Sequence, residues 1–224
     1  MSSNDYCDII SLVFLIEQEK IVKKAKGKKG LLAVISGPSG VGKSTVVARL
    51  MKIAPKLKLS LSATTRPPRP SEKHGIDYKF ITEEEFFKNV RDHDFLEYAQ
   101  VHGFYYGTPK GYVEEEIAKN HVVILEVDVQ GTSKIKELVS KGRVKVAAAV
   151  FIFLIPPSVD ILAFRLKKRK TEEEEMVNYR LRAAIAELQV MEKYDYIVVN
   201  DKVESAAEKI KAIINVEKER IFLN

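Results

Sequence analysis

The chain has 224 residues, 46% of them hydrophobic and 30% charged, which is enough to bury one sizeable core. Its formal net charge of +6 favours anionic partners but does not separate nucleotides from nucleic acids or acidic membranes. The single cysteine, Cys7, excludes an internal disulfide framework and a cysteine zinc site, and four scattered histidines give no metal-ligand spacing. We therefore expect a protein of a reducing compartment, with a cytoplasmic location.

Residues 1–29 end in a lysine-rich run and are expected to form a solvated extension before a domain at 30–224. A basic anchor for a membrane or nucleic acid is the alternative, but it would need a wider apolar face. The apolar run at 9–16 is too short to span a bilayer. We expect neither a membrane nor a nucleic acid as a partner.

Four apolar runs are nearly continuous, as in strands that are covered on both faces of a parallel sheet. They lie at 31–36, 122–129, 148–155 and 196–199. Helical patterns separate most of them, at 44–52, 130–141, 158–169, 172–193 and from about 203. This alternation predicts an α/β doubly wound parallel sheet.

The pattern changes between about 61 and 114, where short aromatic-rich segments predict antiparallel strands around one helix. We interpret this stretch as an inserted subdomain of mixed β/α structure, with the core at 30–60 and 115–224. Thr82 and Glu85 have the spacing of a capping box, and so have Thr171 and Glu174.

A phosphate-binding loop is predicted by "GPSGVGKS" at 37–44, because it follows a predicted strand and opens a helix. Its backbone amides and the helix N-terminus favour a polyphosphate, Lys43 reaches the β and γ oxygens, and the Ser44 hydroxyl is suited to Mg²⁺. Thr45 is a weaker candidate for that ion. The residues assigned to the ATP site are Gly37, Pro38, Ser39, Gly40, Val41, Gly42, Lys43, Ser44 and Thr45.

Two acids share one face at the end of the predicted strand at 122–129, namely Glu126 and Asp128. A doubly wound sheet presents ligand groups at this edge. Capping of the next helix is the alternative role for both carboxylates.

Together these segments resemble the guanylate kinases, P-loop enzymes that transfer a phosphoryl group from ATP to GMP in purine nucleotide metabolism. The resemblance runs from about Leu31 to the C-terminal helix. It rests on "SGPSGVGKST", "SATTRPPRPSEKHGIDYKF", "FLEYAQVHGFYYGTP", "ILEVDVQG", "IPPS" and "RLKKRKTEEE". The family commonly has aspartate where this chain has Glu126, and often glycine where it has Lys170.

The resemblance implies a GMP site in the insertion. Arg66 and Arg69 would bind the phosphate together with the Tyr78 and Tyr106 hydroxyls, because guanidinium groups pair with phosphate oxygens and the neighbouring prolines restrict the loop. Glu97 would accept from the guanine edge, helped by Ser62, Thr108 and Asp128. The sequence does not show whether this phosphate clamp, formed by Arg66, Arg69, Tyr78 and Tyr106, exists before GMP arrives.

The resemblance also implies a lid at about 165–182 that closes on ATP. Arg169 and Arg180, with Arg165 next, would bring positive charge to the transferring phosphate, and Lys43 is the fourth predicted catalytic residue. Glu126 would approach Mg²⁺ through water, and Asn200 would contact the ATP nucleoside. Solvated helical charge pairs are the alternative for Arg165, and a helix cap is the alternative for Asn200.

Two other functions compete with GMP phosphorylation. One is a guanylate-kinase-like module that binds phosphorylated peptides without catalysis, and the other is a P-loop kinase for another phosphorylated small molecule. The oligomeric state and the preference between GMP and dGMP are not determined by the sequence.

Overall fold

The structure is a computed structural model that describes residues 30–70, 72–101, 103–146, 148–167 and 174–220. The N-terminal extension at 1–29 lies outside these ranges, and so do Arg169, Lys170 and Thr171 with their proposed roles. Within the described ranges, no helix is both long and apolar enough to cross a membrane.

Five parallel strands form the core sheet in the order β2-β7-β1-β8-β9, which confirms the predicted fold class. Their bounds are β1 (Leu31–Ser36), β2 (Lys58–Ser60), β7 (Val122–Glu126), β8 (Ala148–Ile155) and β9 (Tyr196–Val199). Three of the four predicted strands have these bounds. The run at 122–129 stops at Glu126 because Asp128 caps the next helix, and the three-residue β2 was not predicted.

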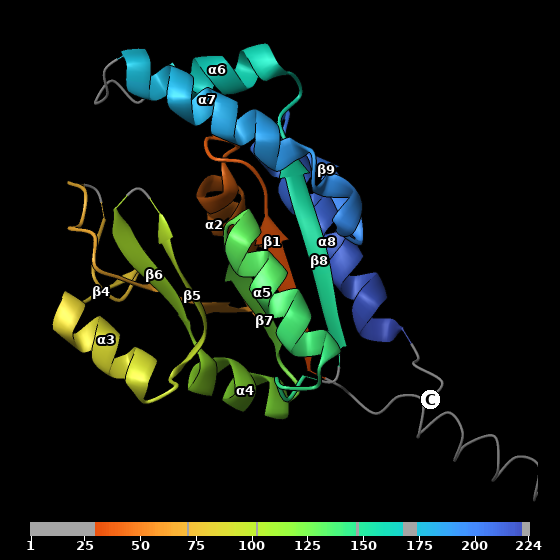
Figure 1. The fold of residues 1–224 in the computed structure, drawn as a ribbon. Coiled ribbons are helices and arrows are strands. Elements are labelled where there is room, and N and C mark those ends of the chain that lie inside the picture. Colours follow the sequence, from red (N-terminus) through yellow and green to blue (C-terminus); the bar gives the residue numbers. More distant parts are fainter. Residues whose placement is uncertain (1–29, 71, 102, 147, 168–173, 221–224) are drawn as a thin grey trace, which may run out of the picture.

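Helices cover both faces of this sheet (Figure 1). Helices α2 (Lys43–Ile53) and α8 (Val203–Glu219) pack on one face, and α4 (Lys110–Ala118) and α5 (Val129–Ser140) pack on the other. The alternation of β1 explains this, because Leu31, Ala33 and Ile35 join the first cluster, whereas Leu32 and Val34 join the second. Every residue of β1 is therefore buried. Helix α4 was not predicted.

The inserted segment forms a second sheet in the order β4-β3-β6-β5. The bounds are β3 (Ala63–Thr64), β4 (Lys79–Phe80), β5 (Phe95–Val101) and β6 (Phe104–Pro109), with α3 (Glu83–Arg91) packed through the buried Phe86. The predicted capping box of Thr82 and Glu85 is present. The predicted antiparallel pairing is confirmed for β5 with β6 and for β3 with β6, whereas β3 and β4 pair in parallel across the connection between them.

Helices α6 (Val159–Lys167) and α7 (Glu174–Leu188) lie beyond the carboxyl end of the core sheet (Figure 1). The predicted helix at 172–193 ends earlier than expected, at Leu188, and the 3₁₀ turn η1 (Met191–Lys193) follows it. Helix α6 rests on the phosphate loop, because a Cβ at Gly40 would meet Leu166 Cδ2 at 2.6 Å. The two helices thus lie directly over the predicted ATP site.

Candidate active site

The carboxyl ends of the parallel strands bring separate motifs to one edge of the core sheet. The phosphate loop follows β1, Glu126 ends β7, and Asn200 follows β9. Between this edge and the second sheet lies a cavity of about 270 Å³. The predicted site residues that line it are Gly37, Ser39, Gly40, Gly42, Lys43, Ser44, Thr45, Ser62, Arg66, Arg69, Tyr78, Glu97, Tyr106, Glu126, Asp128 and Arg180. Pro38, Val41, Thr108, Arg165 and Asn200 are not part of its lining.

The phosphate loop depends on glycine at its two ends. Gly37 has φ of 148° and Gly42, just before α2, has φ of 96°, values that side chains rarely adopt. A Cβ at Gly42 would also lie 2.8 Å from Asn200 Nδ2. Inside the loop, the Lys43 ammonium donates to the carbonyl oxygens of Gly37 at 2.6 Å and Pro38 at 3.2 Å.

Ser44 and Glu126 meet at the mouth of this loop, where the Ser44 hydroxyl donates to Glu126 Oε1 at 2.6 Å. Burial raises the pKa of Glu126, although the Ser44 hydrogen bond and the Lys43 charge oppose the rise. A hydroxyl beside a carboxylate fits a hard cation such as Mg²⁺, which prefers oxygen ligands and retains several waters. Within the described residues, no three His, Cys, Asp or Glu side chains form a cluster that would hold a metal ion alone.

Arg165 and Asn200 bind the phosphate loop at Val41, outside the lining of the cavity. Asn200 Nδ2 donates to the Val41 carbonyl at 2.7 Å, and Arg165 donates to the same oxygen at 3.1 Å and to the Asn200 carbonyl at 3.0 Å. Asn200 is buried. Both residues contact the loop here and not the cavity, so their proposed contacts with ATP stay predictions.

Helix α7 joins the phosphate loop through two groups on Ser39. Arg180 Nη2 donates to the Ser39 hydroxyl at 3.0 Å, and the Ser39 amide donates to the Glu187 carboxylate at 3.0 Å. Arg180 is nearly buried, with 7% of its surface exposed. One turn of the loop therefore lies beside a guanidinium that faces the cavity.

Arg66 is the most constrained group at the opposite wall of the cavity. Its Nε donates to the Tyr106 hydroxyl at 3.2 Å, its Nη1 donates to the Pro67 carbonyl at 2.7 Å, and its guanidinium lies near the rings of Tyr78 and Phe80. Burial, followed by the charge of Glu126, raises the pKa of Tyr78, so this hydroxyl keeps its proton. Two tyrosine rings and the Arg66 guanidinium thus lie together at this wall.

Glu97 supplies a buried carboxylate near this wall. It lies on β5 directly opposite Thr108 on β6, and the Thr108 hydroxyl donates to Glu97 Oε1 at 2.8 Å. Burial raises the pKa of Glu97 to about 7, the Thr108 hydrogen bond opposes the rise, and the charge of Asp128 adds to it. Asp128 itself accepts from the Gly131 amide at 2.7 Å, as the cap of α5.

Sequence reasoning missed four residues that line the cavity, namely Ala99, Val101, Val127 and Glu187. Val127 lies between Glu126 and Asp128, and Ala99 pairs with Tyr106 across the sheet, but the three apolar residues had no chemical signal. It also missed Glu72, whose carboxylate contacts Arg66 and Arg69. The spacing of Glu72 three residues after Arg69 was the available signal.

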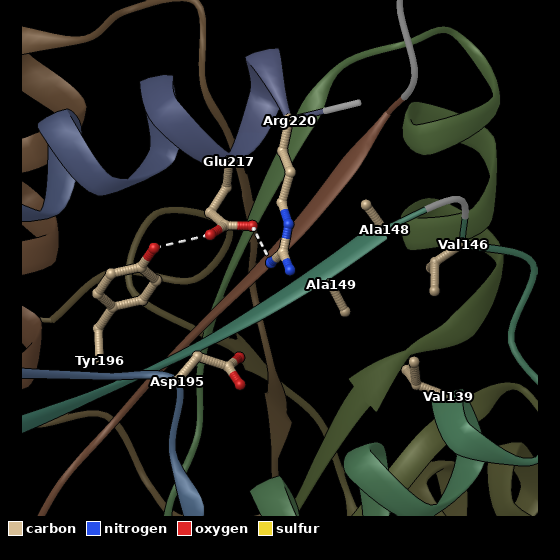
Figure 2. A pocket seen from close by; sticks show the side chains of 8 residues that line it. All are labelled: Val139, Val146, Ala148, Ala149, Asp195, Tyr196, Glu217 and Arg220. Atoms are coloured by element: carbon tan, nitrogen blue, oxygen red, sulfur yellow. Dashed lines mark hydrogen bonds and ion pairs between the residues drawn. The ribbon is translucent and has the colours of Figure 1, made fainter. Parts of the chain in front are cut away.

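A second cavity, of about 510 Å³, lies at the opposite edge of the core sheet, where β8 and β9 begin (Figure 2). Its lining includes the Glu217 carboxylate, which accepts from the Tyr196 hydroxyl at 2.7 Å and from Arg220 at 3.4 Å. None of the motifs identified in the sequence contributes to this cavity. It is therefore separate from the candidate active site.

The comparisons with known proteins agree with this geometry. The family model for guanylate kinase matches residues 29–217. A guanylate kinase of Caldanaerobacter subterraneus is 48% identical over 88% of this chain and 92% of its own length. One from Oceanobacillus iheyensis is 47% identical over 87% and 92%. The crystal structure of guanylate kinase from Anaplasma phagocytophilum superposes with a TM-score of 0.71 at 32% identity, covering 86% of this chain and 88% of that one. The chain belongs to the guanylate kinase family.

Proposed function

We propose that this chain transfers the γ-phosphoryl group of ATP to GMP and releases ADP and GDP. The observation that carries the proposal is one cavity lined by both an intact phosphate loop and the Arg66, Tyr106 and Glu97 side chains. Membership of the family supports the same activity. A cytoplasmic location and a place in purine metabolism remain predictions.

ATP would bind with its phosphates along the loop from Gly37 to Thr45. The amides at the start of α2 favour negative charge, and Lys43 would exchange its loop carbonyl partners for phosphate oxygens. Ser44 and Glu126 are the residues that would hold Mg²⁺, the second through water. When bound, the ion supplies positive charge that neutralises the phosphate oxygens.

GMP would bind across the cavity, with its phosphate on Arg66, Arg69, Tyr78 and Tyr106. Its guanine would face Glu97, whose ionised carboxylate accepts from the N1 hydrogen and the exocyclic amine. Adenine lacks this donor pair and would leave a buried carboxylate unpaired, a penalty of about 1 to 3 kcal/mol. Ser62, Thr108 and Asp128 would assist, Thr108 by fixing the Glu97 carboxylate.

The transfer step needs no general base, because the attacking oxygen of the GMP phosphate is already anionic at neutral pH. A bond forms between that oxygen and the γ-phosphorus of ATP, and the bond to the β–γ bridging oxygen breaks, so that ADP leaves with the electron pair. Arg180 at Ser39 would neutralise charge on the transferring group, and Arg165 and Arg169 are proposed to assist it.

The activity is tested by measuring ADP release with a panel of acceptors. We expect strong stimulation by GMP and dGMP and little by AMP, CMP or UMP. A flat response across the four bases would contradict the assignment of the base site. Stimulation only by a different phosphorylated compound would favour the alternative of another P-loop kinase.

A phosphopeptide-binding module without catalysis is not favoured, because the phosphate loop is intact and α7 places Arg180 beside it. Calorimetry with ATP distinguishes the two functions. A kinase binds ATP, whereas absence of ATP binding together with capture of a phosphopeptide would support the binding module.

A further inference from the structure

The phosphate clamp is organised around an acid that belongs to none of the proposed substrate contacts. Glu72 lies in the loop between β3 and β4, and its side chain is only 13% exposed. Arg66 Nη2 donates to both of its oxygens, at 2.9 and 2.8 Å. Arg69 Nη1 approaches the same carboxylate at 3.4 Å. One carboxylate therefore contacts both arginines that are proposed to bind the GMP phosphate.

The backbone fixes where this carboxylate lies. The Arg69 amide donates to Glu72 Oε2 at 2.9 Å, and the Glu72 amide donates to the Arg69 carbonyl at 2.9 Å. Burial alone would raise the pKa of Glu72, but the Arg69 amide and then the Arg66 guanidinium outweigh it and hold the pKa below its usual range. A carboxylate bound to its own turn in this way stays charged and is held beside the two arginines.

The two arginines differ in how far this contact restrains them. The Arg66 side chain is 11% exposed and has further partners in Tyr106 and Pro67, whereas the Arg69 side chain is 59% exposed. Arg66 is thus set in place in the empty protein. Arg69 lies at the rim of the cavity, where it has room to adjust to a ligand.

We propose that Glu72 is a positioning residue that holds Arg66, and more loosely Arg69, in the orientation that receives the phosphate of GMP. The clamp is then largely formed before the nucleotide arrives, and binding avoids the entropy cost of ordering a long basic side chain. This inference rests on the proposed function, since it takes Arg66 and Arg69 as the phosphate contacts. Glu72 acts through the arginines and touches no reacting atom.

Glu72→Gln tests the role, because it keeps the size of the side chain and removes the charge. Loss of a charge-assisted hydrogen bond predicts a dissociation constant for GMP about tenfold higher, and a similar rise in KM. The kcat should change by less than about twofold, because the arginines reach the same position once GMP saturates the site. Guanosine, which has no phosphate, should bind as tightly as before.

Two further variants make the result specific. Glu84→Gln is the matched control, an exposed acid on α3 of the same subdomain, and should leave GMP binding unchanged. Glu72→Asp retains a carboxylate and should recover part of the affinity, and it remains informative if Glu72→Gln does not fold. Guanosine titration reports whether each variant keeps a folded base site.

Comparison of Arg66→Ala with Glu72→Gln distinguishes failure of the role of Glu72 from failure of the proposed GMP site. If Arg66→Ala weakens GMP binding while Glu72→Gln binds GMP as tightly as the parent or more tightly, the role of Glu72 is wrong and the clamp stands. Equal losses for GMP and guanosine in Glu72→Gln would mean a general structural role and would also overturn it. If Arg66→Ala leaves GMP binding unchanged, the clamp itself is wrong.

Discussion

The two walls of the cavity are built in different ways, and on the proposed function each would bind the phosphate of a different nucleotide. On the core sheet, the phosphate loop is a continuous stretch between β1 and α2, shaped by glycines and held from behind through the Val41 carbonyl. On the inserted sheet, the groups come from separate segments, with Arg66 in a loop, Glu97 on β5 and Tyr106 on β6. A contiguous loop contributes most of one wall, and side chains from separate segments form the other.

On the proposed function, one wall would supply affinity for the ATP phosphates and the other would supply selectivity for the guanine base. A loop of backbone amides and one lysine accepts any polyphosphate and carries no information about the base. The inserted sheet contributes the buried Glu97 carboxylate, which on the proposed function would distinguish guanine from adenine, because an unmatched base leaves that carboxylate unpaired. We therefore expect changes on the core side to alter turnover and changes on the inserted side to alter the use of GMP.

The largest effect is expected for Lys43→Ala. Removing a cation that pairs with the ATP phosphates should weaken ATP binding, and loss of its charge from the transferring phosphoryl group should lower kcat by about 100-fold to 1,000-fold. Binding of GMP alone should stay within about twofold of the parent, because Lys43 lies in the phosphate loop, where it donates to the Gly37 and Pro38 carbonyls. Rates of ADP release together with GMP calorimetry check both statements. Weaker GMP binding with normal turnover in Lys43→Ala would contradict the assignment of Lys43 to the ATP side of the cavity.

Glu97→Gln should damage the other wall. The amide keeps one oxygen but presents an NH₂ group toward the guanine donors, so the KM for GMP should rise about 10-fold to 100-fold while the KM for ATP stays constant. Comparison with IMP, which lacks the exocyclic amine, should show a smaller loss than with GMP. An equal loss for both nucleotides would argue against contact between Glu97 and that amine.

The pH dependence of guanosine binding should follow the same carboxylate. With a pKa of about 7, Glu97 is mostly ionised at pH 8 and mostly protonated at pH 6 in the empty protein. Guanosine should therefore bind about tenfold more weakly at pH 6 than at pH 8, and the Glu97→Gln variant should lose this dependence. Guanosine is used because the phosphate of GMP itself titrates in this range. A flat profile in the parent protein would contradict the role of Glu97.

The raised pKa has a further consequence with the opposite sign for folding. Between the ordinary value of 4.5 and about 7, the folded state holds a proton that the unfolded state releases. This group therefore makes the free energy of unfolding fall as pH rises through that window.

A smaller effect is expected for Gly131→Ala, which adds one methyl group without removing any ligand. Alanine normally favours a helix, but a Cβ here would lie 2.8 Å from Glu97 Oε2, so the carboxylate must shift. The KM for GMP should rise about fivefold, since overpacking by one methyl group costs about 1 kcal/mol or more.

Gly111→Ala in α4 is the matched control, because no atom lies within 4 Å of its added Cβ. It should leave the kinetics unchanged. Equal KM values for the two alanine variants would show that the position of Glu97 tolerates the shift.

The core was the more predictable region, for a physical reason. Strands such as 31–36 and 148–155 are buried on both faces, so their apolar runs show directly in the sequence, and the phosphate loop is a contiguous motif. Helix α4 was not predicted because its apolar residues do not follow a clear helical period. Strand β2 was not predicted because it has only three residues. The parallel pairing of β3 with β4 depends on a long connection that no local pattern encodes.

The candidate site was also predictable in part from the sequence. The resemblance assigned Arg66, Glu97 and Tyr106 to a common site, and the structure brings all three to one cavity. Contacts between distant site residues were beyond the sequence, since that of Thr108 with Glu97 depends on strand register and that of Glu187 with Ser39 on helix packing. For Asn200 and Arg165 the sequence suggested contacts with ATP, whereas the structure shows both bound to the Val41 carbonyl, a supporting role that no motif indicated.

The most direct test of this division is calorimetric titration of both ligands into both variants. The account predicts that Glu97→Gln loses affinity for GMP and binds ATP like the parent protein, and that Lys43→Ala loses affinity for ATP and binds GMP like the parent. Loss of both ligands in either folded variant would contradict the separation of the two walls.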